Sequence, residues 1–186
     1  MPKTNFQMVD LATGRAASGA KLRIAEDERQ HLIEQACEII HEISDVEPSW
    51  FKPGSEKAKG SHLLTVLANG EPISGLYYRV KKDEVTGKRY VSFHHASAQD
   101  KIVKGLFVKA KSQTPGRSLF SWMLRSIGKG AILFPIGSTP KGMDFLRKLE
   151  RERVLKQTAS GYREEFVPTG KKMPRLKIRR KIRRMG

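Results

Sequence analysis

The stretch that decides the fold is Leu106–Ser118, which reads LFVKAKSQTPGRS. The apolar run at its start favours a strand, Gly116 favours a turn, and the residues after Ser118 favour a helix. A strand, a turn and a helix in this order direct backbone N–H groups and the positive end of a helix dipole at one point. The sequence therefore predicts a phosphate-binding turn here. The alternative is a turn that only leads the chain into a helix.

Three segments have the apolar spacing of amphipathic helices. The first covers residues 28–43, with its apolar side chains on one face. The second follows the turn and runs from Leu119 to Ile127, where Gly128 ends it. The third begins at Thr139-Pro140, which is typical of an N-cap followed by a proline in the first helical position, and it continues through Leu149.

The middle of the chain is predicted to be a meander of antiparallel strands. Asn69-Gly70 separates two β-rich runs, and this dipeptide is the strongest short-range signal for a hairpin. The predicted strands are Lys21–Ala25, Leu63–Leu67, Ile73–Val80, Tyr90–His95, Ile102–Val108, Ala131–Ile136 and Tyr162–Val167. Strands and helices in this order predict an α/β (α+β) fold, with one mixed, mostly antiparallel sheet flanked by helices. Residues 20–168 form the predicted domain, residues 1–19 an irregular N-terminal arm, and residues 169–186 a basic tail.

Charge is the strongest compositional signal. The chain of 186 residues carries a formal net charge of +17. Nine of its Lys and Arg residues lie after Thr169, where no acidic residue occurs, so the body of the chain is basic as well. Such a surplus favours polyanions, and we expect nucleic acid as a partner.

The tail is the predicted nucleic-acid contact. Its candidate residues are Arg175, Lys177, Arg179, Arg180, Lys181, Arg183 and Arg184. Such a segment can become ordered on a phosphate backbone and supplies affinity without sequence choice. Ile178 and Ile182 are four residues apart and allow an amphipathic turn, so an anionic membrane surface is the rival target.

Several classes of protein do not fit the sequence. No apolar run approaches the roughly 18 residues of a membrane span, and the N-terminus has no signal core, so a cytoplasmic location is expected (host cytoplasm or virion if the protein is viral). Cys37 is the one cysteine, which excludes an internal disulfide and a Cys-rich zinc site, and His94-His95 alone makes a poor metal site. The P-loop lysine motif is absent too, because Gly116 is followed by Arg117-Ser118 and the earlier glycine of that motif is missing.

The order of the predicted elements resembles the GNAT superfamily of N-acyltransferases. In that family a strand with a bulge leads into a pyrophosphate loop of pattern Q/R-x-x-G-x-G/A, and here Gln113, Gly116 and Ser118 stand in its three fixed places. Residues 22–27, before the first helix, resemble the family's first strand and helix start. Residues 64–75, with the Asn-Gly turn, resemble the hairpin of its second and third strands.

The resemblance implies that acetyl-CoA, or another acyl-CoA, is the cofactor. Backbone N–H groups from Gln113 to Ser118, with Thr114 and Gly116 between them, would then hold the pyrophosphate, and Arg117 and Lys109 would meet other phosphates. A bulged strand near Val108 would offer an N–H to the thioester carbonyl.

Acyl transfer to an amine also needs a base and an acid. The candidates are His94 and His95, which would point to opposite faces of a strand, and Tyr162. Each of them can equally be a core or surface residue without a catalytic role.

Three positions depart from the family pattern. Ser118 replaces Gly or Ala, Pro115 removes one N–H from the loop, and Phe145 lies near the place of a tyrosine that protonates the leaving thiolate. There is also one predicted strand more than the family minimum between Val80 and Ile102. The two functional hypotheses are therefore an acyltransferase that acts on or near nucleic acid, and a catalytically inactive nucleic-acid-binding or structural protein, such as a phage virion component.

Overall fold

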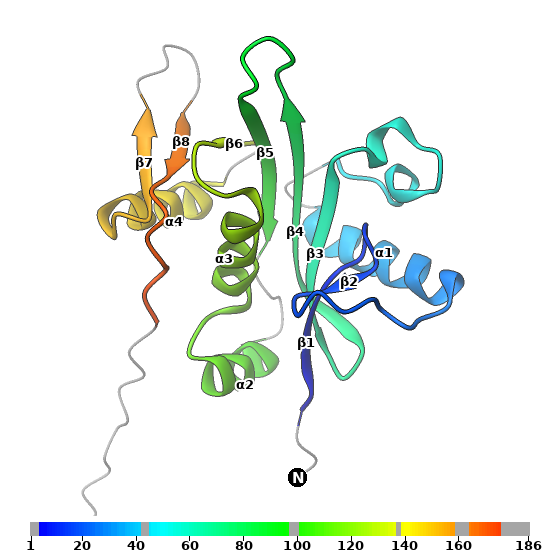
Figure 1. Cartoon of the computed structure of the whole chain (residues 1–186). Coiled ribbons are helices and arrows are strands. Elements are labelled where there is room, and N and C mark those ends of the chain that lie inside the picture. Colours follow the sequence, from blue (N-terminus) through cyan, green and yellow to red (C-terminus); the bar gives the residue numbers. More distant parts are fainter. Residues whose placement is uncertain (1–3, 42–44, 97–100, 137–138, 159–163, 176–186) are drawn as a thin grey trace, which may run out of the picture.

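The structure is a computed structural model that describes residues 4–41, 45–96, 101–136, 139–158 and 164–175. Figure 1 labels its elements along the chain. The strands are β1 (Phe6–Asp10), β2 (Arg15–Ala16), β3 (Ser61–Ala68), β4 (Glu71–Lys82), β5 (Arg89–Ala96), β6 (Ile132–Pro135), β7 (Leu155–Thr158) and β8 (Glu165–Pro168). The α-helices are α1 (Glu26–His41), α2 (Lys101–Lys111), α3 (Pro115–Ile127) and α4 (Pro140–Arg151), and two short 3-10 helices are η1 (Pro48–Phe51) and η2 (Glu56–Ala58).

The described strands form one sheet in the order β2-β1-β3-β4-β5-β6-β8-β7. All neighbouring strands are antiparallel except β5 and β6, which are parallel because α2 and α3 carry the chain across between them. The predicted class, a mixed and mostly antiparallel sheet flanked by helices, is therefore confirmed.

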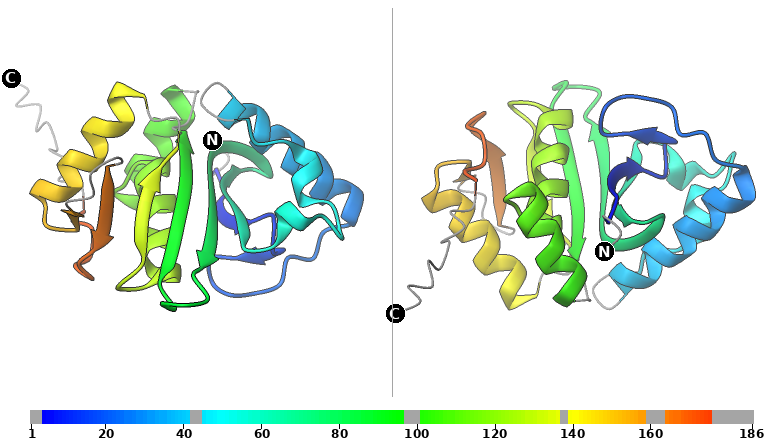
Figure 2. Two further views of the ribbon diagram at one scale, coloured as in Figure 1. Left: turned by 90° about the horizontal axis from the view of Figure 1, so that it is seen from above. Right: turned by 90° about the horizontal axis from the view of Figure 1, so that it is seen from below.

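Two hydrophobic clusters cover the two faces of the sheet. On one face, α1 packs its buried side chains, Ile33 and Ile40 among them, against Leu63 and Leu67 of β3. On the other face, α3 and α4 pack against neighbouring residues of the same strand, such as Leu64. Figure 2 shows α1 well separated from α3 and α4. The alternation along β3 therefore places α3 and any site beside it on the face away from α1.

Local signals in the sequence were reliable. The β3–β4 hairpin turns at Asn69 and Gly70, whose φ angles of 51° and 93° are the positive values that favour this pair of residues. Thr139 caps α4 by accepting the Gly142 N–H at 3.2 Å, with Pro140 in the first position. The predicted helices over residues 28–43 and 119–127 are confirmed as α1 and α3.

The prediction of a strand over Ile102–Val108 is wrong, because these residues belong to helix α2. Three successive apolar residues suggested a strand, but Val103, Phe107 and Ala110 have helical spacing, and only Phe107 is buried. Its ring packs edge-to-face on Phe6 of β1, with 5.1 Å between centroids. Among the described residues, the meander therefore contains only β3, β4 and β5 between η2 and α2. The strand predicted over Tyr90–His95 is confirmed as β5, and the predicted surplus of one strand came from Ile102–Val108, which is helical.

Two predictions near the N-terminus are also wrong. Phe6–Asp10 is not irregular but forms β1, in which Val9 is fully buried and pairs with Thr65. Lys21–Ala25 is not a strand, since only Lys21 makes a bridge, to Arg15. Strand β7 was not predicted from the sequence, and β8 lies within the second half of the segment predicted as the last strand.

Candidate functional site: the carboxyl end of the parallel strands

Strands β5 and β6 pair only as far as Phe93 and Pro135, and the Ile136 N–H then donates to the Phe93 carbonyl at 3.1 Å. Strand β5 continues to Ala96, where it still pairs with Gly75 of β4. Among the described residues, the last part of β5 therefore has a neighbour on one side only. The carboxyl end of parallel strands is where open α/β sheets bind ligands.

Helix α3 begins at this same end of the sheet (Figure 1). Phe120 of α3 packs on Phe93 of β5, with 5.4 Å between ring centroids. Thr114 is the N-cap, and its side chain accepts the Arg117 N–H at 3.2 Å, with Pro115 in the first helical position. The positive end of the α3 dipole therefore lies near the parting of β5 and β6, an arrangement that suits an anionic ligand.

The turn before α3 is tied to the C-terminal segment of the described chain. Arg117 is only 5% exposed, and its guanidinium donates to Gln113 Oε1 at 3.2 Å, Glu152 Oε2 at 3.0 Å and the Pro174 carbonyl at 3.2 Å. Gln113 Nε2 donates to the same carbonyl at 3.1 Å. The charge of Arg117 is thus balanced by Glu152, and residues 171–175 are held against the turn.

The structure changes the interpretation of the predicted cofactor residues. Val108 and Lys109 lie in α2 and not in a bulged strand, so the N–H predicted there for a thioester carbonyl is in a helix. Gln113, Thr114 and Arg117 are brought together with Gly116 and Ser118, as the motif requires. Four of these five residues, however, already form hydrogen bonds with one another or with the C-terminal segment, since the Ser118 N–H also donates to the Thr114 carbonyl at 3.0 Å.

The predicted catalytic residues are only partly described. His94 is buried on the α1 face, with its ring centroid 5.9 Å from that of Tyr77. His95 lies in β5, with a side chain outside the described ones, and Tyr162 lies outside the described residues. Phe145 packs edge-to-face on Phe120, with 5.3 Å between centroids. Of the predicted nucleic-acid contacts, Arg175 is described and exposed, and Lys177, Arg179, Arg180, Lys181, Arg183 and Arg184 lie outside the described residues.

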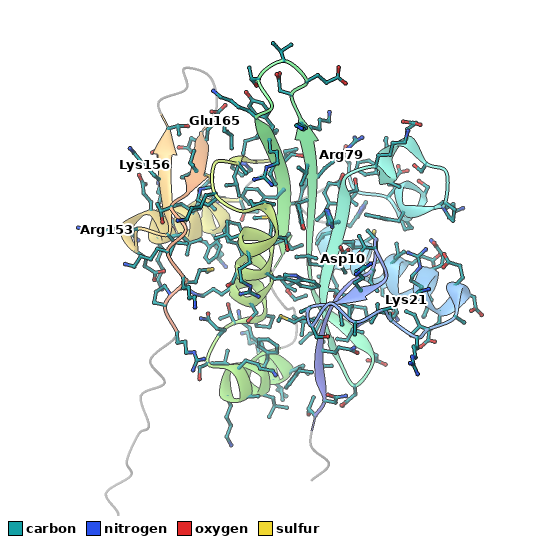
Figure 3. All side chains as sticks on the ribbon, viewed as in Figure 1. Asp10, Lys21, Arg79, Arg153, Lys156 and Glu165 are labelled. Atoms are coloured by element: carbon teal, nitrogen blue, oxygen red, sulfur yellow. The ribbon has the colours of Figure 1, made fainter. Side chains whose placement is uncertain are left out.

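One polar cluster could not be found in the sequence. Asp10 is nearly buried and accepts hydrogen bonds from His62 Nδ1 at 2.8 Å, from the Thr13 hydroxyl at 2.8 Å and from the Leu63 N–H at 3.1 Å. The His62 ring stacks on Tyr78 at 4.4 Å between centroids, and burial raises the pKa of the Tyr78 phenol. Figure 3 labels Asp10, in β1. His62 pairs with Tyr78, and Tyr78 pairs with Phe93, so the cluster lies level with the parting of β5 and β6, two strands away, where it ties β1 to β3.

Comparisons with known proteins find likeness in structure and not in sequence. No protein-family model matches the chain, and no curated protein matches it significantly in sequence. An acetyltransferase from Trypanosoma brucei is 12% identical, with a TM-score of 0.49 over 86% of this chain and 98% of the other. A protein from Desulfovibrio desulfuricans, described as an acetyltransferase of the GNAT family, is 12% identical, with a TM-score of 0.44 over 88% of this chain and 96% of the other. PaiA N-acetyltransferase from Thermoplasma acidophilum, solved in complex with coenzyme A, is 13% identical, with a TM-score of 0.36 over 88% and 97%.

Likeness at this level says nothing about activity. The assignment of the fold rests instead on the order of elements, which agrees in outline with the order expected from the resemblance to GNAT proteins. The differences are helix α2 in place of a predicted strand, and the strands β1, β2 and β7, which the sequence did not predict. Two short strands and a helix, a three-stranded antiparallel meander, the helices α2 and α3, a parallel strand, a further helix and a terminal hairpin follow one another along the described chain. The fold is GNAT-like. Among the described residues, no helix is long and apolar enough to span a membrane.

Proposed function

We propose that this chain is an acyl-CoA-dependent N-acyltransferase, which transfers an acetyl or related acyl group to an amine. The proposal rests on one observation: α3 begins beside the place where strands β5 and β6 separate. An open strand edge and a helix N-terminus at one place can hold a polar carbonyl and a phosphate at the same time.

The residues around the start of α3 fit the phosphates of an acyl-CoA. Lys111 and Arg175 are exposed and line one hollow together with Gln113 and Ser118. The α3 dipole adds a positive potential at the same point. Arg117 is not counted among these ligands, because Glu152 balances its charge. Lys111, Arg175, Ser118 and the first turn of α3 are therefore the groups that would hold the cofactor.

Bound acetyl-CoA would supply the acyl group as a thioester, in which an amine replaces the thiol. The new C–N bond forms as the C–S bond breaks, so the amine must lose a proton and the thiolate must gain one. His94 follows the last residue of β5 that pairs with β6, but its side chain is buried on the α1 face, away from α3. It is therefore not assigned as the base, and the proton of the amine passes to another group or to water. Phe145 cannot supply the proton to the thiolate, so that proton comes from another group or from water.

The binding step can be tested by thermal unfolding of the full chain with acetyl-CoA. A ligand at about a hundred times its Kd stabilises the native state by about 2.7 kcal/mol. For a protein of this size, that free energy corresponds to an increase in Tm of roughly 5 to 10 °C. An unchanged Tm at millimolar acetyl-CoA would contradict the proposal and favour the inactive, nucleic-acid-binding alternative.

A matched pair of variants locates the effect. Ser118→Glu places a carboxylate at the start of α3, where it repels a phosphate, and we expect it to remove most of the acetyl-CoA-dependent increase in Tm. Ser55→Glu introduces the same charge next to η2, where the Ser55 side chain makes no capping hydrogen bond, and should retain the increase. Equal responses of the two variants would mean that acetyl-CoA binds elsewhere.

A further inference from the structure

A basic groove runs along the exposed side of α3, from the start of the helix to its end. Its volume is about 850 Å³, and its walls are β1 and the residues after β2 on one side and the C-terminal segment on the other. The basic groove is defined by Lys111, Arg125, Lys129, Lys171, Lys172 and Arg175, and no Asp or Glu in the described part of the chain lines it. Since the predicted phosphate turn lies at only one end, most of this groove is not explained by cofactor binding.

The six cations of the basic groove are available for a ligand. All six side chains are exposed, and none of them forms a salt bridge within the described part of the chain. Arg125 donates to the Ser121 hydroxyl at 2.9 Å, and Lys171 Nζ donates to the Glu152 carbonyl at 3.1 Å, neither of which neutralises the charge. Unbalanced charges of one sign in a depression concentrate anions.

The cations are spread along a line and do not converge on one point. Ser118 and Gly128 of α3 both line the groove, and at 1.5 Å per residue they are about 15 Å apart along the helix. Lys111 lies at one end of this line, and Arg125 and Lys129 lie at the other. A single phosphate needs converging donors, whereas a row of cations matches the repeated phosphates of a nucleic-acid strand.

The uncharged lining has the groups that such a strand contacts. Gln7, Ser18 and Ser121 offer amide and hydroxyl groups of the kind that bind phosphate and sugar oxygens. Phe6 lies at the end near α2, where a half-buried ring can stack on a base. The chain also leaves the groove at Arg175 and continues with six more Lys and Arg residues and no acid over residues 176–186.

The shape and lining do not suit a membrane surface. A membrane-binding face combines basic residues with exposed apolar side chains. Among the described residues, the large exposed apolar side chains are Val85, Ile102, Leu106 and Ile136, and none of them lines the groove. The apolar side chains in its lining, such as Met8, Leu124 and Met173, are half-buried. We therefore propose that the basic groove, from Lys111 to Lys129, binds the phosphate backbone of a single nucleic-acid strand, independently of the proposed acyl transfer.

The test is a titration of the full chain into a fluorescently labelled single-stranded oligonucleotide of mixed sequence, followed by anisotropy at several salt concentrations. The groove variant combines Arg125→Gln, Lys129→Gln and Lys172→Gln, all at the end of the groove away from the start of α3 or in the C-terminal segment. The control combines Lys52→Gln, Lys57→Gln and Lys59→Gln around η2, outside the groove. Both remove three positive charges, and both are first shown to unfold at nearly the Tm of the unchanged chain.

The groove variant should bind more weakly, and the slope of log K against log salt should decrease by about 2 in magnitude, at about 0.7 for each lost phosphate contact. The control variant should keep nearly the same slope of log K against log salt as the unchanged chain. Equal affinities and slopes for the two variants would overturn the proposal. If the groove variant loses binding to phosphatidylserine vesicles but retains oligonucleotide binding, the groove binds a membrane surface and the proposal is overturned as well.

Acetyl-CoA binding distinguishes this proposal from the preceding one. The groove variant leaves Lys111, Ser118 and Arg175 in place, so its acetyl-CoA-dependent increase in Tm should be unchanged. A groove variant that loses acetyl-CoA binding but retains oligonucleotide binding would show that the groove belongs to the cofactor. A further outcome is that the unchanged chain binds no acetyl-CoA, while its oligonucleotide binding still depends on the groove residues. That result would support this inference and contradict the proposed acyltransferase function.

Discussion

The guanidinium of Arg117 lies 3.0 Å from the carboxylate of Glu152, at the point where α3 begins and α4 ends. Both partners are largely buried, and Arg117 also donates to the Pro174 carbonyl at 3.2 Å. The residue that the sequence nominates as a phosphate ligand therefore joins α3, the end of α4 and the C-terminal segment. The phosphate binding that we propose at this turn would therefore depend on the neighbouring cations and the helix dipole.

Removing the carboxylate from this pair should destabilise the protein. Glu152→Gln leaves the buried Arg117 cation without its counter-charge, and we expect the free energy of unfolding to decrease by about 2 kcal/mol. Urea denaturation measures the change. The matched control is Glu164→Gln, because Glu164 pairs with Arg147 at 4.0 Å on the surface, where such pairs contribute about 0.5 kcal/mol or less. Equal decreases in the free energy of unfolding for the two variants would show that the Arg117–Glu152 pair stabilises the protein no more than a surface ion pair does.

The cluster around Asp10 should be a second point of high sensitivity. Asp10→Ala removes the acceptor of His62, Thr13 and the buried Leu63 N–H, and the expected loss is about 3 kcal/mol. His62→Ala removes one of these bonds and the stacking on Tyr78, so its loss should be smaller, at about 1 kcal/mol. Urea denaturation of both variants decides the order. A larger loss for His62→Ala would contradict the central position of Asp10.

The thiol of Cys37 should be unreactive in the folded protein. Cys37 lies on the buried face of α1, and this burial raises its pKa to about 12, since a thiolate would lose its hydration there. In the unfolded chain the thiol ionises near its ordinary pKa of 9.0. Alkylation by iodoacetamide at pH 8 should therefore be on the order of a hundred times slower in the native state than in urea.

The same shift predicts how stability depends on pH. The folded state holds the Cys37 proton more tightly than the unfolded state, so this contribution is complete below pH 9 and is lost as the pH rises from 9 towards 12. Cys37→Ala should reduce the slope of unfolding free energy against pH in that range. A native thiol that reacts as fast as the unfolded one would contradict its burial.

The residues after Arg175 should add to nucleic-acid affinity without sequence preference. Replacing Lys177, Arg179, Arg180, Lys181, Arg183 and Arg184 by Gln in the full chain should weaken oligonucleotide binding and reduce its salt dependence, by about 0.7 in slope for each lost contact. Anisotropy at several salt concentrations measures both quantities. An unchanged slope would show that these residues do not contact the strand.

Local signals predicted much of the fold, and contacts between distant residues account for what they missed. The Asn69-Gly70 turn and the Thr139-Pro140 cap depend on neighbouring residues, so the sequence was sufficient for them. Leu106–Val108 is apolar enough for either a strand or a helix, and Phe107 packs on Phe6, which is distant in the sequence, in the helical arrangement. Strand β1 is short, and its place in the sheet depends on pairing with β3.

The candidate site shows the same division. The sequence placed Gln113, Gly116 and Ser118 in a turn before a helix, and α3 begins inside that segment, at Pro115. It could not show that Glu152 and Pro174, which are 35 and 57 residues from Arg117, accept hydrogen bonds from the Arg117 side chain. Nor could it show that six cations from α2, α3 and the C-terminal segment line one groove, because that depends on the packing of three elements.

The central claim is that an acyl-CoA binds where β5 and β6 part, against the start of α3. Backbone hydrogen exchange, measured peptide by peptide with and without saturating acetyl-CoA, tests it most directly. We predict that acetyl-CoA slows exchange in residues 93–96 and 113–118, and leaves exchange in the β3–β4 hairpin unchanged. Exchange at both segments that does not respond to acetyl-CoA, or protection confined to other parts of the chain, would contradict the proposed site.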